Sequence, residues 1–172
     1  TGVQTCALPI YEIALFSLRT GMRANEIFSL KWKDIDLTQK TMVLWDTKNK
    51  KTRIIYMASD LIEILSHKKI QDVNDFIFLS KDESKITNVS GSFKRAVKSV
   101  GLNDNVTDPR MKVSFHTLRH TFASWLVEKG EDLYTVKELL GHSTLAMTER
   151  YSHVGNNALQ NAIRKINEIS LE

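Results

Sequence analysis

Two runs of β-branched and aromatic residues, joined by a short polar segment, most constrain what this chain can fold into. The runs are Thr41–Trp45 and Arg53–Met57, and the segment between them reads Asp46-Thr-Lys-Asn-Lys-Lys-Thr. Side chains of these types favour strands because they pack well on a pleated surface. The spacing predicts a β-hairpin with a basic, polar tip.

Helical patterns flank the hairpin on both sides. Apolar residues recur at helical spacing, and glycines or capping residues bound several of these stretches. The sequence predicts helices over 11–19, 23–30, 61–70, 89–100, 118–126, 133–140, 145–151 and 159–166, and a short extended piece over 76–79. Asp132 is expected to cap the helix that ends at Gly141. The fold class is therefore α+β, a predominantly helical domain with a small antiparallel β-sheet.

The composition is that of a globular protein with a net positive charge. The chain has 172 residues, of which 42% are hydrophobic and 26% charged, and a net charge of +4. A positive balance suits a polyanionic partner, because cations that neutralise phosphates release counterions. The single cysteine, Cys6, excludes an intrachain disulfide. No apolar run reaches membrane-spanning length, so we expect a cytoplasmic protein.

The first ten residues form a segment of a different kind. Thr1–Ile10 resembles the in-frame translation of a common DNA-sequencing adapter. We therefore expect this segment to be non-native and the domain to cover residues 11–172, with sequence missing upstream.

The chemistry-bearing residues begin with the stretch His116-Thr-Leu-Arg119-His120. A guanidinium is planar, always charged and able to hold two oxygens at once, which suits a phosphate whose charge increases during cleavage. Arg119 lies beside the apolar stripe of its helix, so we expect it to be partly buried and to face a cleft. A lone arginine is more often a surface group, but the flanking histidines favour a functional role.

A histidine and a tyrosine follow in the same part of the chain. His142 comes directly after Gly141, where an imidazole can donate a hydrogen bond to an anionic oxygen. Tyr151 can act as a nucleophile if positive charge lowers the pKa of its phenol. Taken singly, His142 is better interpreted as a loop histidine and Tyr151 as a core tyrosine. Together they indicate attack of a phenol on a phosphodiester.

Two further cations lie about a hundred residues upstream. Arg23 stands in Thr20-Gly-Met-Arg, and Glu26 one turn later can orient or neutralise it. Lys48 at the hairpin tip can act as a general acid on a leaving oxygen, or be a solvated turn lysine. Histidines and carboxylates lack metal-ligand spacing, and no glycine-rich phosphate loop is present. We therefore expect neither a metal nor a cofactor.

These pieces together resemble the catalytic domain of tyrosine recombinases of the phage-integrase type. The resemblance runs from Tyr11 to Tyr151 and also includes Leu30-x-Trp32-x-Asp34, Leu140-Gly-His142 and Met147-Thr-Glu-Arg-Tyr151. It implies site-specific DNA recombination and integration through a 3′-phosphotyrosyl intermediate, without metal or ATP. The catalytic residues that it implies are Arg23, Lys48, His116, Arg119, His142 and Tyr151.

The resemblance also implies partners. Family members act on double-stranded DNA as tetramers, with a helical core-binding domain before the catalytic one. Their C-terminal segment commonly docks on a neighbouring protomer, and the stripe from Leu159 to Ile166 fits this or docking on its own core equally well. Two other functions stay open: a type IB topoisomerase, and a non-catalytic DNA-binding remnant of a mobile element.

Overall fold

A computed structural model describes residues 8–46 and 51–154. The chain forms two compact units, Thr1–Phe122 and Ala123–Glu172, and each is described by itself. Their boundary falls inside helix α5 (Phe115–Glu128). Within 8–46 and 51–154, every helix lacks the length or the apolar composition that a membrane span requires.

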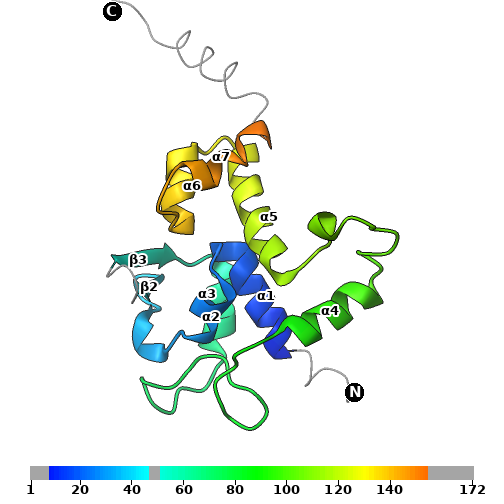
Figure 1. Cartoon of the computed structure of the whole chain (residues 1–172). Coiled ribbons are helices and arrows are strands. Elements are labelled where there is room, and N and C mark those ends of the chain that lie inside the picture. The colour runs from blue at the N-terminus through cyan, green and yellow to red at the C-terminus, as the bar shows by residue number, and fades with distance from the viewer. Residues whose placement is uncertain (1–7, 47–50, 155–172) are drawn as a thin grey trace, which may run out of the picture. The chain divides into compact units, whose positions relative to one another are not determined.

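Among its described residues, the first unit has four helices and a sheet before α5 begins. The helices are α1 (Leu8–Thr20), α2 (Ala24–Phe28), α3 (Ser59–Ser66) and α4 (Ser90–Ser99). The same part of the chain also has two short 3-10 turns, η1 (Trp32–Asp34) and η2 (Pro109–Met111). Helix α1 contacts both α2 and α3 (Figure 1).

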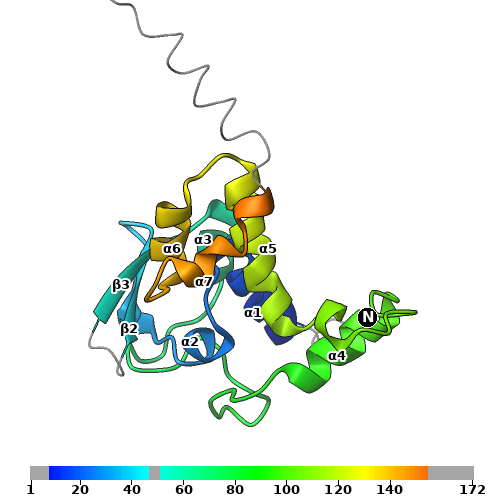
Figure 2. The ribbon, with the colours of Figure 1, turned by 45° about the horizontal axis from the view of Figure 1, so that its top comes forward.

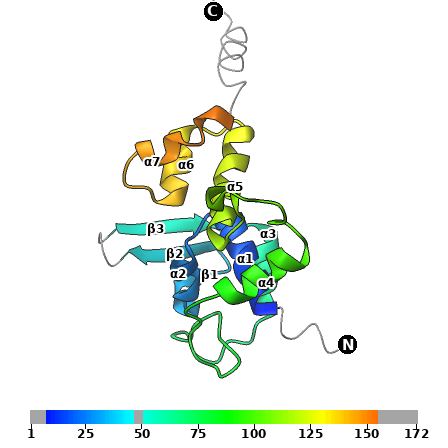
Figure 3. The same cartoon turned by 45° about the vertical axis from the view of Figure 1, so that its right-hand side comes forward.

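The predicted hairpin is present and belongs to a three-stranded antiparallel sheet. Its strands are β1 (Ile35–Asp36), β2 (Thr41–Asp46) and β3 (Lys51–Tyr56), in the order β1-β2-β3 (Figure 3). Register pairs Met42 with Ile55, both buried, and Val43 with Ile54 on the opposite face. The short strand β1 was not predicted, because two residues are too few to show an alternating pattern.

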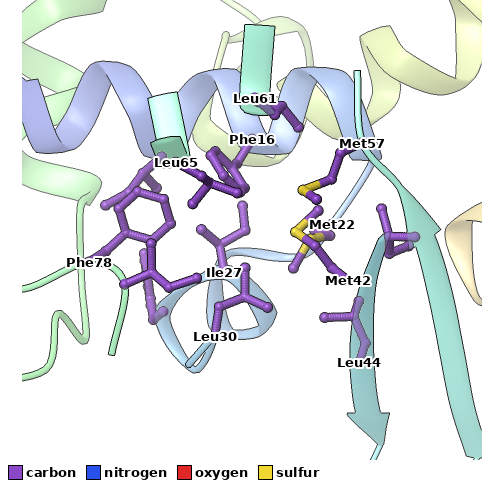
Figure 4. Packing of buried hydrophobic residues seen from close by; sticks show 14 of the residues in the cluster. Phe16, Met22, Ile27, Leu30, Met42, Leu44, Met57, Leu61, Leu65 and Phe78 are labelled. Atoms are coloured by element: carbon purple, nitrogen blue, oxygen red, sulfur yellow. The ribbon is translucent and has the colours of Figure 1, made fainter. Parts of the chain in front are cut away.

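The core of the first unit lies between α1, α2, α3 and the inner face of the sheet. Figure 4 shows its central side chains, which include Phe16, Ile27, Met42 and Leu61, all without exposed surface. Phe16 also meets Phe78 edge to face, with ring centroids 5.0 Å apart. The packing fixes the start of α2, and with it the segment that carries Arg23.

The second unit contains α6 (Leu133–Leu140), α7 (Ala146–Glu149) and the short turn η3 (Ser152–Val154). Asp132 caps α6 as predicted, since its carboxylate accepts hydrogen bonds from the amides of Tyr134 and Thr135. Gly141 ends α6 with a φ of 65°, a left-handed conformation that costs glycine little. Figure 2 shows α7 returning beside α6, which it contacts.

Several predicted helix bounds differ from the structure. Helix α1 begins at Leu8, with Pro9 in its first turn, where a missing amide is tolerated. Helix α3 ends at Ser66 rather than at residue 70, because its buried positions stop at Leu65. Helix α7 ends at Glu149, two residues before Tyr151. The predicted helix over 159–166 lies outside the described residues.

The α+β fold class is confirmed. Helices dominate the described residues, and the one sheet is small and antiparallel. The division into two compact units does not test the predicted domain over 11–172, which stays a prediction.

Candidate active site

Arg119 is one of the largest fully buried side chains, with 2% of its surface exposed. Its Nη1 atom donates a hydrogen bond to the carbonyl oxygen of Gly21, just after α1. A buried guanidinium is costly unless its donors are satisfied, so this bond helps to fix the side chain. The burial is greater than predicted, since the sequence indicated a partly buried arginine.

Arg23 begins the next helix two residues after Gly21. It is the N-cap residue of α2, and its backbone amide donates to Oε2 of Glu26 at 2.8 Å. Its Nη1 also donates to Oε1 of Glu26 at 3.0 Å, while 44% of the side chain stays exposed. The predicted interaction between Arg23 and Glu26 is therefore confirmed. The bond from Arg119 to Gly21 brings the segments of the two predicted arginines together.

His116 and His120 lie one turn apart at the start of α5. Their rings meet edge to face, with centroids 4.7 Å apart. Both line a groove of about 550 Å³, formed by residues of α4, α5 and the loop between them. The basic residues of its lining are Lys94, Lys98, Arg110 and Lys112. His116 thus faces a hollow with a positive rim.

His142 and Tyr151 lie close to a common residue, Thr148, in the second unit. Nδ1 of His142 is 2.9 Å from Oγ1 of Thr148, whose side chain is completely buried. The backbone amide of Tyr151 donates to the carbonyl of Thr148 at 3.0 Å. Tyr151 itself is buried, with 5% of its surface exposed. The hydroxyl of Thr148 therefore orients the imidazole and ties it to the turn that carries the phenol.

The structure thus gives two clusters, each inside one compact unit. The first brings the segment of Arg23 to Arg119, and the second holds His142 and Tyr151. His116 lines a groove of the first unit whose lining includes neither of these two arginines. Lys48 falls among the residues that the structure does not describe, so its predicted position at the hairpin tip stays a prediction. The strands that lead to and from this tip are both described.

Sequence reasoning missed two residues that contact a predicted site residue or its ion-pair partner. Thr148 stood inside the motif that ends at Tyr151, but a lone threonine carries no pattern that predicts a histidine partner. Arg53 was named only as the first residue of a predicted strand. Its Nη2 atom donates to Oε2 of Glu26 at 3.0 Å, so it shares a carboxylate with Arg23.

Across 8–46 and 51–154, no group of three or more His, Cys, Asp or Glu side chains is placed to hold a metal ion.

A sequence model of the phage integrase family matches residues 3–158 of the chain. The chain belongs to the phage integrase family. A tyrosine recombinase XerC of Staphylococcus aureus is 37% identical over 149 residues, which cover 82% of this chain and 47% of that protein. The integrase of Salmonella phage P22 is 28% identical over 97% of this chain and 45% of its own length. The chain spans about half the length of these relatives.

Solved structures of phage integrase relatives share the fold. The site-specific recombinase XerH, bound to its difH substrate in a pre-cleavage complex, matches with a TM-score of 0.72 and 26% identity. This match covers 99% of the chain and 49% of XerH. The catalytic domain of bacteriophage HP1 integrase matches with a TM-score of 0.62 and 28% identity, over 89% of the chain and 79% of that domain.

Proposed function

We propose that this chain is the catalytic domain of a site-specific DNA recombinase that cleaves and rejoins strands through a 3′-phosphotyrosyl intermediate. The observation that carries the proposal is the buried Arg119, whose hydrogen bond to Gly21 holds it beside the segment of Arg23. Two guanidiniums held in this way suit the charge that builds on a phosphate under attack. The family and the recombinase relatives support the same chemistry.

Each predicted residue takes one role in this proposal. The phenol oxygen of Tyr151 attacks the scissile phosphorus, and the bond to the 5′-oxygen breaks. Arg23 and Arg119 hold the non-bridging oxygens, which carry most of the charge of a phosphoryl transition state. His142 donates a further hydrogen bond to these oxygens, and Thr148 orients its ring. Lys48 protonates the leaving 5′-oxygen, and His116 accepts or returns the proton of the tyrosine.

The energy balance of this cycle needs neither ATP nor a metal. The phosphotyrosyl bond stores the energy of the phosphodiester, and the 5′-hydroxyl of another strand reverses the attack. We propose double-stranded DNA as the partner, which the positive groove at His116 and the net charge of +4 support. XerH is described in complex with its difH DNA. Assembly of the whole protein as a tetramer on two duplexes belongs to the same proposal.

Trapping the covalent intermediate tests the proposal. The chain, alone and supplied with a core-binding domain from a relative, is incubated with a pool of nicked duplexes of randomised sequence. A nick a few nucleotides 3′ of the cleaved phosphate lets the short fragment that carries the free 5′-hydroxyl diffuse away, so religation fails and the protein stays covalently bound to the DNA. We expect a covalent protein–DNA band that survives denaturation, and sequencing of the trapped DNA identifies the preferred duplex.

Two controls give the band its meaning. Tyr151→Phe removes the nucleophile and should abolish the band, whereas a chelator should leave it unchanged. Duplex binding without any band would instead favour a non-catalytic DNA-binding module. Relaxation of supercoiled DNA without strand exchange would favour a topoisomerase. Lack of a band from the unaltered chain, while a related recombinase gives one, would reject the proposal.

A further inference from the structure

We propose that Arg53 is a positioning residue for Arg23, acting through the carboxylate of Glu26. The inference rests on the function proposed above, in which Arg23 holds a phosphate oxygen. Arg53 lies on β3 and Arg23 at the start of α2, so strand and helix meet at one acid. All three residues belong to the first compact unit.

The carboxylate of Glu26 is shared between the two arginines. Its Oε2 accepts from the backbone amide of Arg23 at 2.8 Å and from Nη2 of Arg53 at 3.0 Å. Its Oε1 accepts from Nη1 of Arg23 at 3.0 Å. Arg53 thus donates to the same oxygen that caps α2, and moving this oxygen would move the start of the helix that carries Arg23.

The exposure of the three side chains falls in order from the solvent inward. Arg23 is 44% exposed, Glu26 26% and Arg53 16%. The most buried member, Arg53, is aligned with buried Leu44 across the sheet, so its stem is held by the hairpin. The most exposed member is the one proposed to meet DNA. The cluster therefore has a fixed inner end and an accessible outer end.

Charge explains why a second arginine is useful at this place. Arg23 and Glu26 alone would form a neutral pair, and the carboxylate would repel an approaching phosphate. With Arg53 the three groups carry a net charge of +1, so Arg23 keeps its attraction for an anion while Glu26 still orients it. Loss of Arg53 should thus weaken phosphate binding by Arg23 without removing Arg23.

The same ion pair joins two elements of the first unit. Arg53 lies on β3, and Glu26 follows Arg23 by one helical turn in α2. The contact between Arg53 and Glu26 joins residues 27 positions apart. A displacement of β3 would therefore shift the carboxylate that caps the N-terminus of α2.

A double-mutant cycle tests the route through Glu26. Single-turnover rates of covalent adduct formation are measured on the trapped duplex, at saturating protein, for Arg53→Gln, Glu26→Gln and the pair. We expect Arg53→Gln to slow cleavage on the order of 10²-fold, as a small misplacement of a catalytic group can. In the Glu26→Gln background the same change should cost no more than about 2-fold, because the charge through which Arg53 acts is gone.

Matched variants separate positioning from folding. Arg53→Lys keeps the positive charge but loses the planar guanidinium with its several donors. Its rate should lie between those of the unaltered chain and Arg53→Gln. Arg19→Gln is the control, since Arg19 makes an exposed ion pair with Asp60 at 2.6 Å in the same unit. Arg19→Gln removes one arginine, as Arg53→Gln does, and should leave the rate of adduct formation unchanged. Urea unfolding of each variant shows how much of a rate loss comes from reduced stability of the fold.

The outcomes are distinct. An Arg53→Gln rate equal to that of the unaltered chain overturns the inference while leaving the proposed function intact. Equal rate losses from Arg53→Gln with and without Glu26 also overturn it, because Arg53 would then act independently of the carboxylate. A lack of adduct from the unaltered chain counts against the proposed function instead. Strong coupling with rescue by lysine supports the inference.

Discussion

The guanidinium of Arg119 donates to the carbonyl oxygen of Gly21, joining residues 98 positions apart. The donor is buried in α5, and the acceptor belongs to the turn between α1 and α2. One guanidinium edge is thus used to hold the side chain in place. A planar group with several donors can do this and still bind a phosphate oxygen, which a single ammonium does less well.

Arg119→Lys should therefore lose activity although it keeps the charge. We expect the rate of adduct formation to fall on the order of 10³-fold, as for other arginines that stabilise a phosphoryl transition state. Single-turnover kinetics on the trapped duplex measure this loss. Duplex binding at low salt should change little. A lysine variant that cleaves at the normal rate would show that the planar guanidinium of Arg119 is not required.

Gly21→Ala should act on the acceptor side of the same bond. Gly21 has a φ of 66°, a left-handed conformation in which a side chain is strained. We expect a loss of about 1–2 kcal/mol in the free energy of unfolding, measured with urea. The rate of cleavage should fall as well, because the carbonyl that fixes Arg119 would shift.

Gly130→Ala is the control for the cost of a positive φ alone, since Gly130 has a φ of 93°, has open space around it and follows α5. A normal rate in Gly21→Ala would show that Arg119 does not depend on this turn.

Much of the fold follows from local patterns in the sequence. The hairpin, the break at Gly21 and the capped helix α6 were predictable because strand-forming runs, a glycine and a capping aspartate each act over a few residues. The exact end of α3 was not, because it depends on where buried contacts stop. Strand β1 exists only through its pairing with β2, which no local pattern shows.

The site was predictable only as a set of residue types. The motifs named Arg23, Arg119, His142 and Tyr151, but not what holds them. The bond from Arg119 to Gly21 and the contact between Arg53 and Glu26 join distant segments, and a single sequence contains no signal for either pairing. The burial of Arg119 exceeded the prediction for the same reason, since helical spacing places a residue on a face without showing what covers it.

The stability that the charged carboxylate of Asp132 adds at the N-cap of α6 should be lost in acid. Hydrogen bonds from the side chain and amide of Thr135 lower the pKa of Asp132 below its usual 3.8. A carboxylate with a lowered folded pKa adds stability that is present above 3.8 and is lost as the pH falls through the folded value. Asp132→Asn keeps an acceptor for the amides but has no charge. We expect the variant to be less stable than the unaltered chain in urea at neutral pH and equally stable well below pH 3.8. A difference that persists in acid would assign the effect to geometry instead of charge.

Thr148→Val should separate orientation of the histidine from packing of the turn. Valine has nearly the same shape as threonine, so the buried space stays filled, but Nδ1 of His142 loses its contact with Oγ1 at 2.9 Å. We expect a loss of about 1 kcal/mol in stability and a fall in the cleavage rate on the order of 10-fold, because the ring loses a contact that orients it toward the phosphate. Thr148→Ser is the matched control, since it keeps the hydroxyl and loses a methyl group, and it should cleave at nearly the normal rate. If both variants cleave equally fast, the hydroxyl does not orient His142, and the packing of Thr148 accounts for its burial.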